Sequence, residues 1–219
     1  MSTTPHRLRD APAFLFVYAL VIAAFTVSAL GGLDVARVAL KPVPVLVLFV
    51  WVRRAAPRDG MTARLLFGLA LCALGDVVIE TGRFVPGLVA FLVGHLGYIA
   101  AFVHEERALA LGRAVAFGLW GVVAIALLWG GLGEMKVPVI LYTATICAMM
   151  WRASALLGGG RGWASLIVAG AVLFAVSDTV IAIDRFRLPF AAARVIILSL
   201  YWLGQPLIAA GAVSRPSRA

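Results

Sequence analysis

The chain has 219 residues, of which 63% are hydrophobic and 13% are charged, and its mean hydropathy is +1.03. A soluble protein of this size could not bury so much apolar surface, so the composition predicts a polytopic membrane protein. The formal net charge of +9 does not indicate a nucleic-acid partner, because the basic residues are spread over many short loops, as the positive-inside rule expects.

Eight apolar stretches, each of roughly the length that crosses a bilayer as a helix, follow one another along the chain. They cover approximately residues 13–30, 38–52, 61–80, 86–103, 110–130, 137–156, 163–183 and 190–212. The basic N-terminus continues into the first stretch, which we interpret as a span and not as a cleaved signal peptide. The sequence therefore predicts an all-α fold, a single transmembrane domain over residues 1–219 with eight membrane-spanning helices.

Lysine and arginine counts predict the orientation of these helices. If the N-terminus is inside, 12 of the 19 basic residues lie on the inner side and 7 on the outer side. This excess predicts that both termini are cytoplasmic. In a bacterial host, the inner membrane is the expected location of such a protein.

The two halves of the chain repeat. Asp76 in the third stretch and Asp178 in the seventh each follow a small residue and precede an Arg-Phe pair that begins seven residues later. The Lys41–Pro42 pair at the start of the second stretch resembles the Lys136–Pro138 segment at the start of the sixth. Because equivalent stretches are four helices apart, the repeat keeps its orientation, which predicts two parallel four-helix pseudo-repeats.

The repeated aspartates are the first candidates for chemistry. A carboxylate at bilayer depth costs ~2.5–3.5 kcal/mol on insertion scales, so Asp76 and Asp178 are expected to face a polar interior. In a pseudo-twofold bundle the third and seventh helices would meet at the centre, and two carboxylates in a low-dielectric site would share a proton. The structural alternative is that both aspartates only hold the bundle together through ion pairs with basic residues such as Lys41, Arg83, Arg185 or Arg194.

Other polar residues line one face of otherwise apolar stretches. Phe91, His95 and Tyr98 share a face of the fourth helix through i,i+4 and i,i+3 spacing. Stripes of this kind suit a central polar cavity. Alternatively, His95 is a structural hydrogen-bonding residue and the tyrosines are interface anchors. The remaining candidates are Lys41 at the outer mouth of the second helix, Tyr142 in the sixth, Ser177 beside Asp178 in the seventh, and Tyr201 with Gln205 in the eighth.

The residue inventory argues against two common hydrolytic sites. Of the three histidines, His6, His95 and His104, only His95 lies at predicted membrane depth, so a three-histidine zinc site is not expected. The Gly-x-Ser-x-Gly elbow of serine hydrolases is absent from the sequence. Cys72 and Cys147 both fall within predicted spans, so we expect no disulfide. The sequence therefore predicts no metal and no cofactor.

At these residues the chain resembles the YhhN family of membrane proteins, whose animal members are lysoplasmalogenases. The resemblance extends from about residue 38 to 212 and includes the number of helices. The order and spacing of the matching pieces are more specific than any single piece. These pieces are Lys41–Pro42, Gly75–Asp76, Phe91 with His95 and Tyr98, Tyr142, Leu173–Phe174 with Ser177–Asp178, and Tyr201 with Gln205.

The resemblance implies a hydrolase that acts in the lipid bilayer on a lysoplasmalogen, which is a single-chain ether phospholipid. Cleavage of the vinyl ether bond would give a fatty aldehyde and glycerophosphoethanolamine or glycerophosphocholine. A bacterial member could act on another single-chain lipid. The hydrocarbon chain of the substrate would lie in an apolar groove open to lipid.

Vinyl ether hydrolysis also fits the residues themselves. Protonation of the β-carbon gives an oxocarbenium ion that water captures, so the reaction needs an acid and a nearby anion. Glycosidases divide these roles between two carboxyl groups. We therefore expect Asp76 and Asp178 to be the acid–base pair. The expected substrate-binding residues are Lys41 for the lipid phosphate, His95, Tyr98, Tyr142, Tyr201 and Gln205 for water and the glycerol oxygens, and Ser177.

Two other functions fit the same residues. Parallel repeats and midplane acids are typical of small proton- or cation-coupled transporters, although eight spans in 219 residues is small and no helix is obviously broken at the aspartates. A non-catalytic lipid-binding protein would need the aspartates for assembly and would release no product. Uptake into liposomes would favour the transporter.

Overall fold

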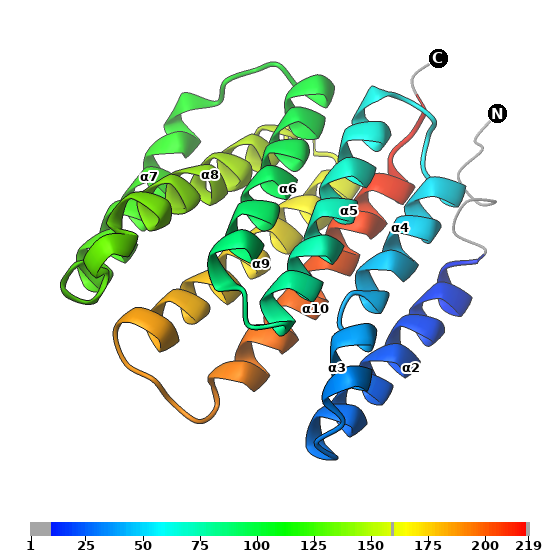
Figure 1. Ribbon diagram of the computed structural model, residues 1–219. Coiled ribbons are helices and arrows are strands. Elements are labelled where there is room, and N and C mark those ends of the chain that lie inside the picture. The colour runs from blue at the N-terminus through cyan, green and yellow to red at the C-terminus, as the bar shows by residue number, and fades with distance from the viewer. Residues whose placement is uncertain (1–9, 159, 218–219) are drawn as a thin grey trace. The chain divides into compact units, whose positions relative to one another are not determined.

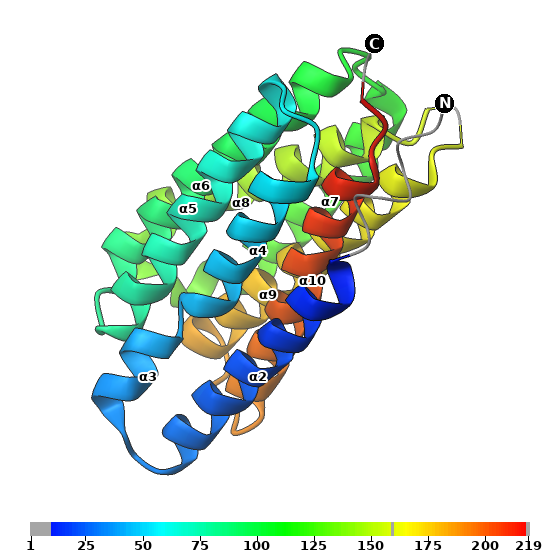
Figure 2. The same ribbon diagram turned by 90° about the vertical axis from the view of Figure 1, so that its right-hand side faces the viewer.

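Figures 1 and 2 show the computed structural model of the chain, which describes residues 10–158 and 160–217. All regular structure in these residues is helical, and eight helical spans are long and apolar enough to cross a membrane. The predicted all-α fold with eight spans is therefore confirmed. The spans consist of α2 (Ala11–Leu30), α3 (Asp34–Leu40) with α4 (Val43–Ala55), α5 (Gly60–Glu80), α6 (Phe84–Glu105), α7 (Leu111–Leu128), α8 (Lys136–Ala155), α9 (Gly162–Phe186) and α10 (Ala193–Ser214).

The orientation of the chain stays a prediction. The count that places both termini in the cytoplasm includes Arg7, Arg9 and Arg218, and these three residues lie outside the described part of the chain. The same holds for His6, which was considered as a metal ligand and set aside.

The second span is interrupted at Lys41, between α3 and α4. Pro42 and Pro44 have no N–H group, so the carbonyl groups of residues 38 and 40 lose their donors in the helical ladder. The span begins at Asp34 and not near residue 38. Lys41 therefore lies one short helix inside the span, and not at its mouth as the sequence suggested. The sixth span differs, because two 3₁₀ turns, η1 (Trp129–Gly131) and η2 (Gly133–Met135), precede α8.

The helices divide into two compact units, and each is described by itself. The first unit comprises Met1–Ala101 with Ala209–Ala219, and the second comprises Phe102–Ile208. Within the first unit α4 packs against α2 and α5, and within the second unit α8 packs against α7 and α9 (Figures 1 and 2). One boundary falls within α6, near the end of the fourth span, where the predicted repeat also divides, and the other falls within α10. The single-domain arrangement and the parallel relation of the halves stay predictions.

A buried stripe runs along α5 and ends at an aspartate. Leu65, Leu69, Cys72 and Asp76 follow one another at intervals of four, three and four residues, which places them on one side of the helix. Each of these four side chains is at most 2% exposed. The equivalent positions of α9 repeat the pattern, with Ile167, Ala171 and Phe174 buried and Asp178 partly buried. Helical periodicity therefore places each aspartate on the face that packs inside its own unit.

The first unit is closed by a contact between its two chain segments. Asp59 caps the N-terminus of α5 and accepts a hydrogen bond from the Thr62 N–H group at 3.0 Å. Its second carboxylate oxygen forms an ion pair with Arg215, whose side chain is 1% exposed. Partial burial acts to raise the pKa of Asp59, but the hydrogen bonds from Arg215 and Thr62 outweigh it and hold this pKa below its usual range. One carboxylate thus connects the start of α5 with the end of α10.

Acidification is expected to weaken this contact. A carboxyl group whose pKa is lowered in the folded state contributes stability above its unfolded pKa of about 3.9, and this stability is lost as the pH falls through the folded pKa. Asp59→Asn keeps an N-cap and removes the charge, so we expect a thermal midpoint about 2–4 °C below wild type near pH 7. The difference should shrink as the pH falls below about 3.9 and through the lowered folded pKa, where the wild-type carboxyl group becomes protonated. Thermal unfolding in detergent at neutral and at acidic pH measures this difference in midpoint. A difference that does not change with pH would contradict a stabilising charge on Asp59.

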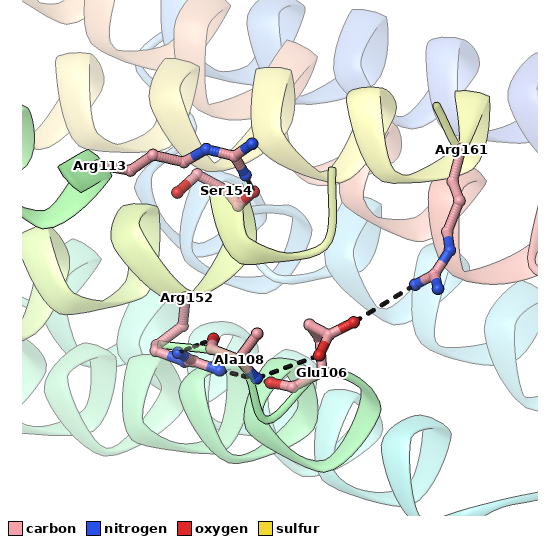
Figure 3. Close-up of polar contacts among 6 residues, drawn as sticks. All are labelled: Glu106, Ala108, Arg113, Arg152, Ser154 and Arg161. Carbon is pink, nitrogen blue, oxygen red and sulfur yellow. Dashed lines mark hydrogen bonds and ion pairs between the residues drawn. The ribbon is translucent and has the colours of Figure 1, made fainter. Parts of the chain in front are cut away.

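At one end of the second unit, arginines hold the segment between α6 and α7 (Figure 3). Arg152 donates to the carbonyl oxygen of Ala108 at 2.8 Å and to that of Glu106. The Glu106 carboxylate faces Arg161 at 3.7 Å. Arg113 donates to a backbone carbonyl in the last turn of α8. The guanidinium groups of Arg113 and Arg152 therefore satisfy backbone carbonyls at this end.

Candidate functional site

In the first unit, an ion pair joins the second and third spans near Asp76. Arg37 on α3 places its Nε 2.7 Å from Glu80 Oε1 on α5, and the Glu80 side chain is only 7% exposed. Glu80 lies one turn beyond Asp76, which is 2% exposed. Neither Arg37 nor Glu80 was chosen as a site residue from the sequence, because both stand near predicted helix ends.

This ion pair determines the register between the second span and α5. Lys41 lies four residues after Arg37 on the second span. Asp76 lies four residues before Glu80 on the third, and the two spans run in opposite directions. Lys41 is therefore level with Asp76 along the helices. Its side chain is buried, with Nζ 5.3 Å from the centroid of the Phe25 ring on α2. A buried cation at the level of a buried carboxylate lowers the cost of both charges in an apolar bundle.

Tyr18 on α2 also belongs to the surroundings of Asp76. Its side chain is 6% exposed, and it lies close enough to Asp76 for the two groups to interact electrostatically. The first apolar stretch shows no polar stripe that would have marked this residue. The first span thus brings the phenol group of Tyr18 to the region of Asp76, and the sequence reasoning did not identify this residue.

Two glycines let α6 approach α5 closely. A Cβ at Gly75 would lie 2.6 Å from the Phe91 ring, and a Cβ at Gly68 would collide with the Tyr98 ring. The predicted common face of α6 is confirmed, because Phe91, His95 and Tyr98 are 8%, 0% and 0% exposed. The centroid of the His95 ring lies 6.5 Å from that of Phe91 and 6.4 Å from that of Tyr98. The imidazole of His95 is therefore fully enclosed.

In the second unit, Asp178 accepts a hydrogen bond from a tyrosine of the neighbouring helix. The Tyr142 hydroxyl on α8 donates to Asp178 Oδ2 at 2.6 Å, and Tyr142 is 9% exposed. This distance is typical of an O–H group that donates to a charged carboxylate. At the next residue of α9, Thr179 accepts a hydrogen bond from the Trp120 indole N–H on α7 at 3.4 Å. Three helices of this unit therefore meet around Asp178.

The other predicted residues of the second unit lie where α9 contacts α10. The Ser177 hydroxyl donates to the carbonyl oxygen of Ile197 at 3.0 Å. The Tyr201 ring packs edge-on against Phe174, with the ring centroids 5.1 Å apart. Gln205 is fully buried. The Ser177 hydroxyl and the Tyr201 ring thus contribute to helix packing, whatever else these side chains do.

The predicted site residues fall into two groups, one in each unit. Each group combines a carboxyl group with neighbouring donors, which suits proton transfer and the stabilisation of a cation. The predicted proton-sharing pair joins residues of different units and stays a prediction. Within residues 10–158 and 160–217, no three His, Cys, Asp or Glu side chains come together as a metal site. The first group contains Lys41, Asp76, His95 and Tyr98, and the second contains Tyr142, Ser177, Asp178, Tyr201 and Gln205.

Eight apolar spans, with a carboxyl group on the inward face of two of them, define an integral membrane protein with polar side chains at depth. Within that class, the family assignment is direct. The model of the YhhN family matches residues 36–212, so the chain belongs to this family, and the resemblance seen in the sequence is confirmed.

Curated relatives carry a common name. The chain is 36% identical over 182 residues to lysoplasmalogenase TMEM86B of Homo sapiens, an alignment that covers 81% of this chain and 75% of the relative. It is 37% identical over 158 residues to lysoplasmalogenase TMEM86A of Bos taurus, with 68% and 65% covered. It is also 37% identical over 154 residues to a lysoplasmalogenase of Mycobacterium bovis, with 65% and 58% covered. No solved structure matches the chain.

Proposed function

We propose that the protein is a lysoplasmalogenase, an ether-bond hydrolase that cleaves the vinyl ether of a single-chain phospholipid in the membrane. Relatives at 36–37% identity that carry this name support the substrate class. The observation that carries the proposal is that Asp76 and Asp178 stand at equivalent positions of the inward-facing stripes on α5 and α9. A carboxyl group on such a face is costly, and its duplication exceeds what packing requires.

The reaction adds one water molecule across the vinyl ether. A proton is added to the β-carbon, the resulting oxocarbenium ion is attacked by water at the α-carbon, and the hemiacetal collapses to an aldehyde and an alcohol. One carboxyl group supplies the proton, and the other carboxylate stabilises the cation and accepts a proton from water, as in glycosidases. We assign these two roles jointly to Asp76 and Asp178.

Neighbouring side chains prepare each carboxyl group for its role. Tyr142 orients Asp178 through the 2.6 Å hydrogen bond. Lys41 is level with Asp76 and balances negative charge there, either on the carboxylate or on the lipid phosphate. His95 and Tyr98 form the buried face of α6 beside α5, where they would position water or the glycerol oxygens. Enclosure in apolar helices strengthens each of these electrostatic interactions.

An assay of the purified protein tests this function. The protein in detergent is incubated with a lysoplasmalogen, and fatty aldehyde is measured. A saturated alkyl ether lysolipid of the same chain length is the control substrate, because it has no vinyl group and should release no aldehyde. Aldehyde from the vinyl ether alone supports the proposal, and its absence with a folded protein rejects it.

Tyr142→Phe is expected to lower kcat about ten- to a hundredfold, because a hydrogen bond to a charged group contributes about 1.5–3 kcal/mol. Tyr142 acts through Asp178 and is a positioning residue, so the substitution should also move the pH–rate profile. Thr145→Val on the same helix is the matched control, since the Thr145 hydroxyl donates to its own helix at Leu141. A rate that falls equally at every pH would indicate a purely structural role for the phenol.

Transport of protons or cations is the second candidate, and one observation favours it. The helices that carry Asp76 and Asp178 are unbroken, as the sequence predicted, but the second span is broken at Lys41–Pro42, level with Asp76. Transporters often use interrupted helices at their binding sites. Flux into liposomes that requires Asp76, without aldehyde release from the same preparation, would favour transport over hydrolysis.

A further inference from the structure

The second unit carries an apolar groove between α7 and α8, and we propose that it holds the hydrocarbon chain of the lipid substrate and selects its length. The groove has a volume of about 650 Å³, and no lining residue is charged. This inference rests on the proposed function, because it names the part of the protein that would bind the tail of the same single-chain lipid.

Small residues of α7 create the groove. A Cβ at Gly121 would lie 3.0 Å from Cys147 Sγ on α8, so the two helices touch there and form the floor. A Cβ at Gly118 would meet nothing within 4 Å, so the groove is open above that residue. Only 11% of the α7 span is buried inside the structure, which leaves the groove facing outward. In a bilayer a hydrocarbon chain would fill it, since a void forfeits dispersion contacts on its lining.

The groove begins at the level of Asp178. Tyr142, which donates to Asp178, lies two residues from the lining residue Ile140. At the other end Trp151 closes the groove, and the carbonyl oxygen of Leu109 holds its indole N–H at 2.6 Å. From Ile140 to Trp151 the helix rises about 16 Å, close to the ~15 Å depth of one hydrocarbon leaflet. The groove therefore matches one hydrocarbon chain in length, and its Ile140 end lies at the height of Asp178 along α8, although Tyr142 itself faces away from the lining because residues two apart point to different sides of a helix.

Both ends of the second unit carry an excess of basic residues, so the position of Asp178, and not charge, sets the direction of the lipid. The arginines at the Trp151 end, Arg113 and Arg152, donate to backbone carbonyls and hold the chain together there (Figure 3). The end nearer to Asp178 has an excess of positive charge, which suits a phosphate group. Its basic residues are Lys136, Arg185, Arg187 and Arg194, against the acidic residues Glu134 and Asp184. Because the groove begins at the height of Asp178, the headgroup would lie beyond this residue and the chain end would reach Trp151.

Gly118→Leu tests the groove, because its side chain enters open space and leucine forms helix better than glycine. Gly112→Leu is the matched control, since it lies on the same helix in open space and does not line the groove. With long-chain lysoplasmalogen, Gly118→Leu should lower kcat/KM about tenfold, mainly through KM. The loss should be smaller for a substrate shortened by several carbons. Gly112→Leu should keep the wild-type ratio of kcat/KM for the long-chain substrate to kcat/KM for the shortened one. A wild-type chain-length preference in Gly118→Leu overturns the inference.

A binding experiment separates this inference from the proposed activity. The probe is a non-cleavable alkyl ether lysophosphocholine with a diazirine near the end of its chain, photolysed with the intact protein in detergent. Cross-links on α7 and α8 peptides that are lost in Gly118→Leu and kept in Gly112→Leu support the groove, and they do so even if no aldehyde is ever formed. Cross-links spread over all spans, or equal in both variants, would show ordinary lipid contact and overturn it.

Discussion

Asp76→Asn and Asp178→Asn are each expected to lower aldehyde release by about 10²–10⁴-fold, the range that a general acid or base contributes. Asparagine keeps the size of the side chain, but it can neither donate a carboxyl proton nor carry the negative charge. The losses should appear in kcat, because both groups act on the developing cation and not on ground-state binding. The measurement is the steady-state rate of aldehyde formation at saturating lysoplasmalogen.

Asp184→Asn is the matched control for these variants. Asp184 lies on α9, as Asp178 does, and its carboxylate accepts a hydrogen bond from the Phe190 N–H group at 3.1 Å, which an amide oxygen can also accept. This variant should turn over close to the wild-type rate. The thermal midpoints of all three variants report whether they fold. Full turnover by both Asp76→Asn and Asp178→Asn would reject the two-carboxylate mechanism, and a loss in one variant alone would reject the shared proton.

The aspartates could be predicted from sequence because they end a helical stripe. Leu65, Leu69 and Cys72 mark the buried face of α5 by spacing alone, and Asp76 is the next position on that face. The same reasoning identified the common face of Phe91, His95 and Tyr98 on α6. Periodicity within one helix determines which side chains turn inward, so inward-facing residues were accessible without any knowledge of how the helices pack.

Contacts between helices were not accessible in this way. The approach of Tyr18 to Asp76 depends on the packing of α2, and no local pattern reports it. Lys41 was placed at the mouth of its span because the predicted stretch began near residue 38 and left out the charged residues Asp34 and Arg37. These two side chains pair with each other at 3.2 Å, and Arg37 also pairs with Glu80. Because these charges are compensated in the folded protein, α3 belongs to the second span although its sequence alone did not indicate this.

Lys41→Met is expected to lower kcat about 10²-fold, comparable to the removal of one preorganised electrostatic group. Its counterpart in the repeat, Lys136, lies at the half-exposed start of α8 with Nζ 4.6 Å from the centroid of the Trp129 ring. Lys136→Met should therefore keep the wild-type kcat, and any loss should appear in KM, because Lys136 stands at the end that suits the lipid phosphate. Steady-state kinetics distinguishes two roles for Lys41, since a residue that only binds phosphate would raise KM and leave kcat unchanged. That second result would contradict a role at Asp76.

The proposed charge compensation between Lys41 and Asp76 has a separate test in thermal stability. Removal of one of two opposite buried charges leaves the other uncompensated and costs about 3–5 kcal/mol, whereas removal of both is often nearly neutral. Lys41→Met should therefore lower the thermal midpoint, and a second substitution, Asp76→Asn, should recover much of the loss. Adding Glu80→Gln instead should recover nothing, because Glu80 pairs with Arg37. If Asp76→Asn brings no recovery, then Lys41 is balanced by another group and the register argument is wrong.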